Sequence, residues 1–393
     1  MLSGQILAHM GMLIQIDCLP LVPARWQGHF LFGYKAMSVK PITSLNANAR
    51  SVIAVRNTAE STMTRTLHNE GLAAVLPTMV ARLCTGVGLV TPDSFVNCDH
   101  SDFDGLVAFV CAVQTGKGRA VPIYVNTAYS GKLPAHPEAP PRKRKLRQEY
   151  NSRELNLYEQ TVVDLEALAA HLGFWPRLVF DRGFSGGPLV HVLVDYKATF
   201  YIRMKADRLV AICGQPLKTS QLTGNDCVVG LDGMRLRVIR SETPASGEPW
   251  YILTSDMTST RDEIIKVYYY RFEIEESFKD VKHIQDLHKL QVDLSLSLKV
   301  VLWFVILGIL LLYLSSLKAL GKHWFEQRTG HPKKRLSWYR WLHELLEWLI
   351  WQPLYETVTG GAREVHVGQF FGRLCKPRNT SYPWLAEPSK RCE

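Results

Sequence analysis

The stretch VYYYRFEIEESFKDVKH, residues 267–283, combines three tyrosines, one arginine, three glutamates and two lysines in one short run. Upstream of it, Thr260 is followed by Asp262 and Glu263. Because acidic residues are favoured in the first turn of a helix, we expect a helix that begins near Thr260 and includes the whole stretch. At about 100° per residue, this helix would carry one apolar face that packs on a core. The apolar face consists of Val267, Tyr270, Ile274, Phe278 and Val281.

Two polar faces remain on the same expected helix. One lies within an arc of about 60° and consists of Tyr268, Arg271, Glu275 and Lys282. The other, which we expect to face solvent, consists of Glu273, Glu276 and Asp280. Oppositely charged residues four positions apart, such as Arg271 and Glu275, are common on exposed helices. A carboxylate beside a buried face can also complete a metal site, and the stretch alone leaves both interpretations open.

Residues 94–205 show apolar patterns that predict the element order β-β-β-α-β-α-β. The sequence TGKG at 115–118 predicts a hairpin turn between the second and third strands, and Gly173 predicts the end of the first helix. Residues 206–257 contain short apolar runs separated by turn residues, which predicts a small β-rich region. The expected elements are strands within 94–99, 105–114, 119–127, 177–184 and 199–205, and helices within 153–172 and 187–197.

Two aspartates follow apolar runs that we expect to be strands. Asp99 ends the run SFVNC, and Asp181 ends the run RLVF. Open α/β sheets usually build their sites where strands end, although an aspartate in this place is often only a turn former. Asp102 and Asp104 compete with Asp99, but they lie beyond the apolar run and fit a turn better.

Together these features resemble a known family. The strand and helix order, with one acid on the first strand, one after the fourth and one on a late helix, resembles a ribonuclease-H-like core. The sequence is similar to DDE transposases of the insertion-sequence-four group, whose signature is Tyr, two residues, Arg, three residues, Glu, six residues and Lys. This chain has Tyr268, Arg271, Glu275 and Lys282 at those spacings. VFDRGF resembles the family's second aspartate segment, VNCDHSDFDG resembles the first, and the resemblance covers residues 93–318.

The resemblance implies a mixed α/β fold with five regions. A ribonuclease-H-like catalytic core would comprise 93–205 and 258–320, and a β-rich insertion at 206–257 would lie between the second aspartate and the glutamate. A mainly helical region at 1–92 would recognise the transposon ends, although we find no clear helix-turn-helix there. A helical region at 321–393 would complete the chain.

The resemblance also implies the chemistry. Asp99, Asp181 and Glu275 would bind two divalent ions, Mg²⁺ or Mn²⁺, whose preference for oxygen ligands suits carboxylates. Tyr268, Arg271 and Lys282 would hold the transposon-end strand. The expected activity is cut-and-paste transposition, with strand cleavage and strand transfer at inverted-repeat ends. The expected partners are end DNA, target DNA and a second copy in a synaptic homodimer, without a nucleotide cofactor or membrane, in the bacterial cytoplasm at the nucleoid.

The charge of the chain agrees with a polyanionic partner but is a weak indicator. The net charge is +10 and the pI is about 9.1. The most basic loop either contacts the DNA backbone or is simply solvated. Its cations are Arg142, Lys143, Arg144, Lys145 and Arg147.

Two other functions remain as alternatives. The first is a metal-dependent nuclease or resolvase on the same core, without strand transfer. The second is a single-span membrane protein, because residues 300–317 contain no charge and are about long enough to span a bilayer. A helix buried on all sides is equally apolar, and the family covers its sheet with hydrophobic helices, so we expect burial.

Residue usage elsewhere predicts ordinary core packing. Trp250 resembles either a strand core residue or the wedge that some family members use to flip a base, and its apolar surroundings favour the core. The eight cysteines have no zinc-motif spacing, and several lie in apolar runs. We therefore expect buried free thiols in a reducing compartment.

Overall fold

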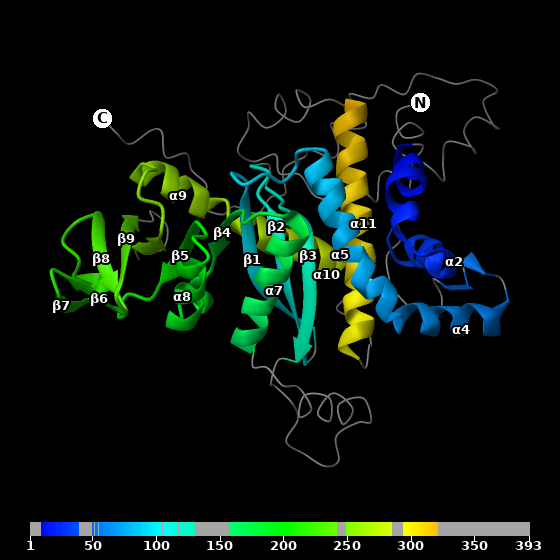
Figure 1. Cartoon of the computed structure of the whole chain (residues 1–393), viewed down its shortest axis with the longest axis horizontal. Helices are drawn as coiled ribbons and strands as arrows, with labels where there is room; N and C mark the ends of the chain where they lie inside the picture. Colours follow the sequence, from blue (N-terminus) through cyan, green and yellow to red (C-terminus); the bar gives the residue numbers. More distant parts are fainter. Residues whose placement is uncertain are drawn as a thin grey trace, which may run out of the picture.

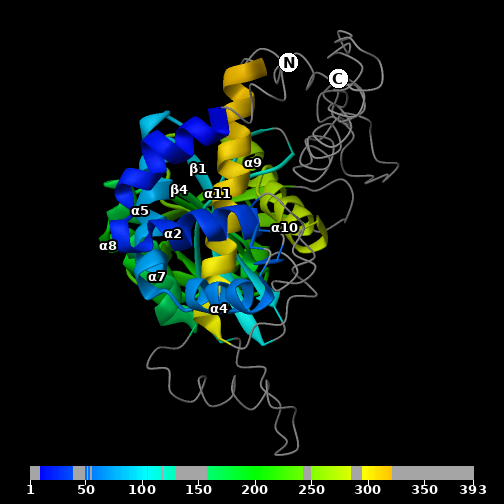
Figure 2. The ribbon, with the colours of Figure 1, turned by 90° about the vertical axis from the view of Figure 1, so that its right-hand side faces the viewer.

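A ten-stranded sheet in the order β3-β2-β1-β4-β5-β10-β9-β8-β6-β7 runs through the described part of the chain. The computed structural model describes residues 9–38, 49–50, 52–53, 55–103, 105–116, 118–129, 157–241, 249–284 and 294–320. Helices pack on both faces of the sheet, and Figure 2 shows α5, α7 and α8 on one side of it and α9 and α10 on the other. The protein therefore has a mixed α/β fold, as predicted.

The first half of the sheet contains the five strands that the sequence predicted. β1 (Phe95–Phe103), β2 (Leu106–Val113) and β3 (Val121–Tyr129) form an antiparallel meander. β4 (Arg177–Phe180) and β5 (Phe200–Met204) follow in parallel with β1. β2 is buried along its whole length, which agrees with its uninterrupted apolar sequence.

Residues 206–257 form short strands, as expected, but these strands continue the same sheet. β10 (Trp250–Thr254) pairs antiparallel with β5 and with β9 (Met234–Ser241). The remaining strands are β6 (Leu209–Ile212), β7 (Gln215–Lys218) and β8 (Asp226–Leu231). Figure 1 places them at the end of the sheet farthest from the N-terminal helices. The sequence did not predict that this region would join the main sheet, because strand pairing is a long-range contact.

Helices cover the sheet. One face of the sheet is covered by α5 (Glu70–Gly86), α7 (Leu157–Leu172) and α8 (Gly187–Asp195). These helices bury apolar residues at helical spacing, such as Leu165, Leu168 and Leu172 of α7. α7 ends as predicted at Gly173, whose φ of 81° lies in the left-handed region that favours glycine. The opposite face carries α9 (Arg261–Tyr269) and α10 (Phe272–Ile284). Short 3₁₀ helices lie at η4 (Arg182–Phe184) and η5 (Thr219–Gln221).

The described part of the N-terminal region is helical. Its elements are η1 (Ile14–Cys18), η2 (Leu19–Leu21), α2 (Ala24–Gly33), η3 (Tyr34–Ser38) and α4 (Arg56–Leu67), followed by α5. α4 ends at Leu67, and α5 begins at Glu70. Asn69 is the N-cap of α5: its side-chain oxygen accepts a hydrogen bond of 3.0 Å from the backbone N–H of Leu72.

The apolar helix is a core helix. α11 (Ser295–Leu320) is the one described helix that is long and apolar enough to cross a membrane, and 89% of its most apolar window is buried inside the protein. It lies beside β3 and α5 (Figure 1). Trp303 packs edge-on against Tyr124 of β3 with ring centroids 5.7 Å apart, and Phe304 contacts Phe30 of α2. The predicted burial of 300–317 is confirmed.

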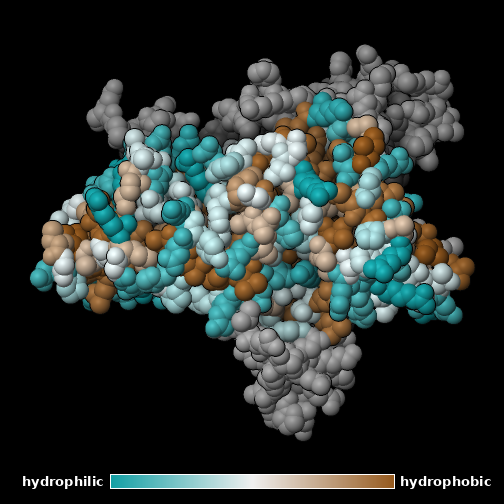
Figure 3. Space-filling model, viewed as in Figure 1, coloured by the Kyte–Doolittle hydropathy of each residue, from teal (hydrophilic) through white to brown (hydrophobic). Residues whose placement is uncertain are grey.

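The surface and the remaining predicted segments complete the fold. Over the described part of the face seen in Figure 1, hydrophilic and hydrophobic residues are interspersed (Figure 3).

The basic loop at 142–147 and the helical region predicted at 321–393 lie outside the described residues. Four of the described cysteines are buried free thiols, which confirms that expectation for them: Cys18, Cys84, Cys98 and Cys111. Trp250 is 8% exposed in β10, so its predicted place in the core is confirmed.

Candidate active site

The stretch at 267–283 forms two helices, so the prediction of one continuous helix is wrong. α9 ends at Tyr269 and α10 begins at Phe272. The sheet causes the break, because its side chains bind carbonyls that a continuous helix would use. Gln114 donates a hydrogen bond of 3.0 Å to the carbonyl of Val267, and Asn97 of β1 donates one of 3.2 Å to the carbonyl of Tyr270. The N–H of Arg271 therefore bonds to Tyr268 instead of Val267.

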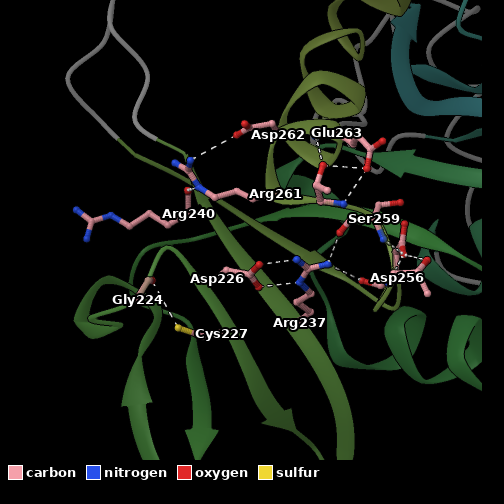
Figure 4. Close-up of polar contacts among 12 residues, drawn as sticks. Gly224, Asp226, Cys227, Arg237, Arg240, Asp256, Ser259, Arg261, Asp262 and Glu263 are labelled. Atoms are coloured by element: carbon pink, nitrogen blue, oxygen red, sulfur yellow. Dashed lines mark hydrogen bonds and ion pairs between the residues drawn. The ribbon is translucent and has the colours of Figure 1, made fainter. Parts of the chain in front are cut away.

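The start of α9 is attached to β9 and to the turn after β10 (Figure 4). α9 begins directly after Thr260, which agrees with the predicted start; Thr260 caps the helix, and Glu263 completes a capping box. Arg237 of β9 forms an ion pair with Asp226 and donates a hydrogen bond of 2.6 Å to the carbonyl of Ser259, directly before the cap. Figure 4 shows Arg237 between these two partners. These contacts place α9, and α10 after it, over the sheet.

The register of the parallel strands brings the two predicted aspartates into one row. Cys98 of β1 pairs with Phe180 of β4, and Phe180 pairs with Ile202 of β5. The next position on each strand is Asp99, Asp181 and Arg203. Because successive side chains point to opposite faces of a sheet, and Cys98, Phe180 and Ile202 pack in the main core, this row faces α9 and α10.

Asp99 lies inside a strand, which corrects the expectation that it ends one. β1 continues to Phe103, because it pairs with β2 as far as Leu106. Asp99 is the first residue beyond the pairing with β4, so its side chain is still presented next to Asp181. Asp181 follows β4 as predicted and caps η4, where it accepts a hydrogen bond of 2.7 Å from the N–H of Gly183.

Arg271 lies between two of the predicted carboxylates. Its Nη1 atom is 3.7 Å from Oδ2 of Asp99, and its Nη2 atom donates to Oε1 of Glu275 at 2.5 Å. The Arg271 side chain is 9% exposed and that of Glu275 is 39% exposed. The ion pair between Arg271 and Glu275 is therefore present. It is only partly exposed to solvent, and Arg271 also contacts Asp99 of β1.

The pKa of Asp99 reflects this crowding. Burial raises the pKa of Asp99 to about 7, Arg271 opposes the increase, and the charges of Asp181 and Glu275 add to it. The three predicted carboxylates are therefore close enough to interact electrostatically. The neighbouring His100 is on the opposite side of the strand, where it stacks on Phe184 with ring centroids 4.8 Å apart. Burial lowers the pKa of His100 to about 4.

The carboxylates fit a hard divalent cation in donor chemistry but are not arranged as one compact ligand set. Carboxylate oxygens are the ligands that Mg²⁺ and Mn²⁺ prefer. Among the residues that the structure describes, no three His, Cys, Asp or Glu side chains are close enough together to hold one metal ion. The Arg271 guanidinium contacts Asp99 and Glu275 in this conformation, so it compensates part of the charge that a cation would compensate.

Of the other two predicted DNA-binding residues, Tyr268 is buried beside Arg271, whose guanidinium carbon lies 5.9 Å from the centroid of the Tyr268 ring. Tyr268 is 1% exposed and packs edge-on against Trp250 with ring centroids 5.3 Å apart. Burial raises the pKa of Tyr268 to about 12. Lys282 is in α10, but its side chain lies outside the described residues. Their contacts with DNA stay predictions.

The face that we expected to be solvated is buried, so that expectation is wrong. Glu273 is 4% exposed and Asp280 is 5% exposed, because both pack against the loop between β2 and β3. Glu276 forms an ion pair with Arg119 of the same loop. The apolar face is confirmed most clearly at Ile274 and Val281, which are 1% and 8% exposed.

Sequence reasoning missed Arg203. This residue occupies the same row as Asp99 and Asp181, and its guanidinium lies 5.8 Å from the ring centroid of Trp250. Among the described residues its side chain has no ion pair or hydrogen bond. The signal in the sequence was a single charge inside the apolar strand FYIRM, whose other residues are buried.

Part of the chain matches a known protein family. Residues 149–312 match a family model described as a transposase DDE domain. The matched range covers less than half of the chain and includes Asp181, Arg203 and Glu275 but not Asp99. A comparison with curated proteins gave no match. The family match supports a DDE transposase, a DNA-acting enzyme of a class that uses divalent metals, and the mixed α/β fold with its large mixed sheet fits such an enzyme.

Proposed function

We propose that the protein is a transposase that cuts and rejoins DNA at the inverted-repeat ends of its own insertion element. The observation that carries this proposal is the row formed by Asp99 in β1 and Asp181 directly after the parallel strand β4, with Arg271 contacting both Asp99 and Glu275. The match to a transposase DDE domain supports it independently of the geometry. The insertion-sequence-four group is favoured by the spacing of Tyr268, Arg271, Glu275 and Lys282.

We propose a ribonuclease-H-like core for this enzyme. The order β3-β2-β1-β4-β5, with β2 antiparallel to its neighbours and β1, β4 and β5 parallel, supports this assignment. Residues 206–257 would then be the β-rich insertion between Asp181 and Glu275. Residues 1–92 would recognise the ends, and 93–205 and 258–320 would form the catalytic core.

The three carboxylates would bind two divalent ions, Mg²⁺ or Mn²⁺, which would activate a water or a 3′-hydroxyl for in-line phosphoryl transfer. Arg271 reduces the repulsion between Asp99 and Glu275, because its guanidinium contacts both carboxylates. Arg203 lies beside Asp181 and is suited to a phosphate oxygen of the bound strand, because a guanidinium offers two parallel donors. Lys282 and Tyr268 would contact the transposon-end strand as the family signature implies.

The remaining features of the proposal concern partners and place. The net charge of +10 favours DNA as a partner through its phosphates. We propose that the enzyme acts on end DNA and target DNA as a synaptic homodimer, without a nucleotide cofactor, in the bacterial cytoplasm at the nucleoid. The burial of α11 in the core removes the main argument for a membrane protein.

The test uses the purified protein, Mg²⁺ and labelled DNA that ends in the inverted repeats flanking its gene. We expect strand cleavage followed by joining to a target plasmid. Glu275→Gln should abolish cleavage and leave end binding intact, whereas Glu263→Gln, a change of the same kind at the exposed cap of α9, should leave cleavage in place. Cleavage by the Glu275 variant would refute the site. Hydrolysis without joining would favour the nuclease or resolvase alternative.

A further inference from the structure

The loop between β2 and β3 binds the first turn of α10 through a buried carboxylate. Glu273 accepts backbone hydrogen bonds from Thr115 at 2.8 Å, Gly116 at 3.3 Å and Gly118 at 2.7 Å. Gly116 and Gly118 have φ values of 69° and 87°, a conformation that glycine adopts freely and that turns successive N–H groups toward one anion. The backbone of Glu273 also accepts a hydrogen bond of 3.2 Å from the N–H of Ala120.

A second set of contacts continues along the same face of α10. Arg119, whose side chain is 5% exposed, donates from Nε to Asp280 at 2.9 Å, and its Nη1 atom is 3.2 Å from Oε2 of Glu276. Ser277 donates a hydrogen bond of 2.8 Å to the carbonyl of Ala120. We call these interactions between α10 and residues 115–120 the hairpin contact. It extends over eight residues of the helix, from Glu273 to Asp280, so it fixes both the rotation of α10 and its position along its axis.

Glu275 projects from the other side of this helix. Side chains two positions apart on an α-helix point in directions that differ by about 200°. Glu273 therefore points into the loop, while Glu275 points toward Arg271 and Asp99. An outer side-chain atom lies about 5–6 Å from the helix axis, so a rotation of α10 by about 20° would move the Glu275 carboxylate by about 2 Å. Metal ligands and catalytic groups tolerate displacements of only about 0.5 Å.

We infer that the hairpin contact positions Glu275 for divalent metal binding, with Glu273 as its principal positioning residue. This inference rests on the proposed function, since it assumes that Glu275 is a metal ligand. Glu273 itself would touch neither metal nor DNA. Its carboxylate binds the loop, and the loop is joined to β2, which pairs with β1 at Asp99. The contact therefore connects two of the three carboxylates through the backbone of one hairpin.

The experiment measures Mn²⁺ binding to the DNA-free protein by electron paramagnetic resonance, together with the Mg²⁺ dependence of cleavage, end binding and thermal denaturation. Glu273→Gln keeps the shape of the side chain but replaces one acceptor oxygen by a donor that faces the loop N–H groups. We expect Mn²⁺ affinity to fall about 10- to 100-fold, as for other residues that orient metal ligands, while affinity for end DNA stays within about twofold of wild type. Ser277→Ala, a milder change in the same contact, should shift Mn²⁺ affinity in the same direction by a smaller factor.

Glu263→Gln is the matched control, because Glu263 accepts hydrogen bonds from Thr260 at the start of α9 and has no part in the hairpin contact. If the substituted side chains only stabilise the fold, all three variants (Glu273→Gln, Ser277→Ala and Glu263→Gln) should have a lower denaturation temperature and an unchanged Mn²⁺ affinity. A folded Glu273→Gln protein with wild-type Mn²⁺ affinity would overturn the inference. If that variant does not fold, wild-type Mn²⁺ affinity in Ser277→Ala overturns it instead.

Failure of the proposed function gives a different result. If Glu275→Gln leaves Mn²⁺ affinity and cleavage unchanged, Glu275 is not a metal ligand and the inference is wrong together with the proposed site. If Glu275→Gln abolishes both and Glu273→Gln changes neither, the proposed function stands and only the positioning role is refuted.

Discussion

Asp164 offers a quantitative test of the electrostatics of this fold. It lies in α7, is 2% exposed, and its Oδ1 atom accepts hydrogen bonds from Tyr124 at 3.2 Å, Asn126 at 2.6 Å and Gln160 at 3.3 Å. All three donors use the same oxygen, so an asparagine can accept the same bonds through its own Oδ1. Asp164→Asn therefore removes the ionisable group and keeps the hydrogen-bond geometry.

The magnitude follows from the pKa of this carboxyl. Burial raises the pKa of Asp164 from 3.8 to about 6, against the opposing effects of its hydrogen bonds and of Lys299. The folded state therefore binds the proton more tightly than the unfolded state, and this contribution to stability is fully present below about pH 4 and is lost as the pH rises through about 6. About two pKa units at 1.36 kcal/mol each amount to about 3 kcal/mol. Above pH 6, Asp164→Asn should be more stable than wild type by up to that amount.

The assay is urea denaturation of both proteins at a series of pH values between 4 and 8. We expect similar free energies of unfolding near pH 4 and a difference that grows to about 3 kcal/mol in favour of the variant by pH 7.5. Glu166→Gln is the control, because Glu166 lies in the same helix but accepts its hydrogen bond from Tyr196 at the surface, and it should follow the wild-type pH dependence. Parallel pH profiles for wild type and Asp164→Asn would refute the reasoning.

Three further predictions concern helices α2, α11 and α10. Gly33→Ala should lower the free energy of unfolding by about 1–3 kcal/mol, because an added Cβ would lie 2.5 Å from the ring of Phe304. Gly28→Ala in the same helix, where nothing lies within 4 Å, should raise it by about 0.5–1 kcal/mol, so equal effects in denaturation curves would contradict the packing. Leu310→Ala in α11, at a residue that is fully buried, should cost about 2–5 kcal/mol in the same assay, and the wild-type protein should stay in the detergent-free supernatant after ultracentrifugation. Lys282→Ala should weaken end binding and reduce the slope of log affinity against log salt by about 1, and an unchanged slope would remove Lys282 from the DNA contacts.

Local patterns predicted most of the elements near the site. The apolar runs that became β1, β4 and β5 and the Thr260–Glu263 capping box depend on neighbouring residues, so they could be recognised in the sequence. The spacing of Arg271 and Glu275 likewise predicted their contact, because residues four apart meet on any helix. Arg203 could have been found in the same way, as the charge inside the apolar strand FYIRM. Only the strand register, which pairs Phe180 with Ile202, assigns Arg203 to the same row as Asp181.

The sequence by itself determined the kinds of residue available for chemistry, the order of the strands and helices that carry them, and the resemblance to a transposase. Tertiary structure decided where the helix at 260–283 breaks, because Asn97 of β1 and Gln114, directly after β2, are far away in the chain and bind its carbonyls. It also decided that Glu273 and Asp280 are buried, although their polarity alone indicated a solvated face. A carboxylate is stable inside a protein only when donors from elsewhere in the chain surround it. The N–H groups of Thr115, Gly116 and Gly118 and the guanidinium of Arg119 reach α10 only after β2 and β3 have folded into a hairpin.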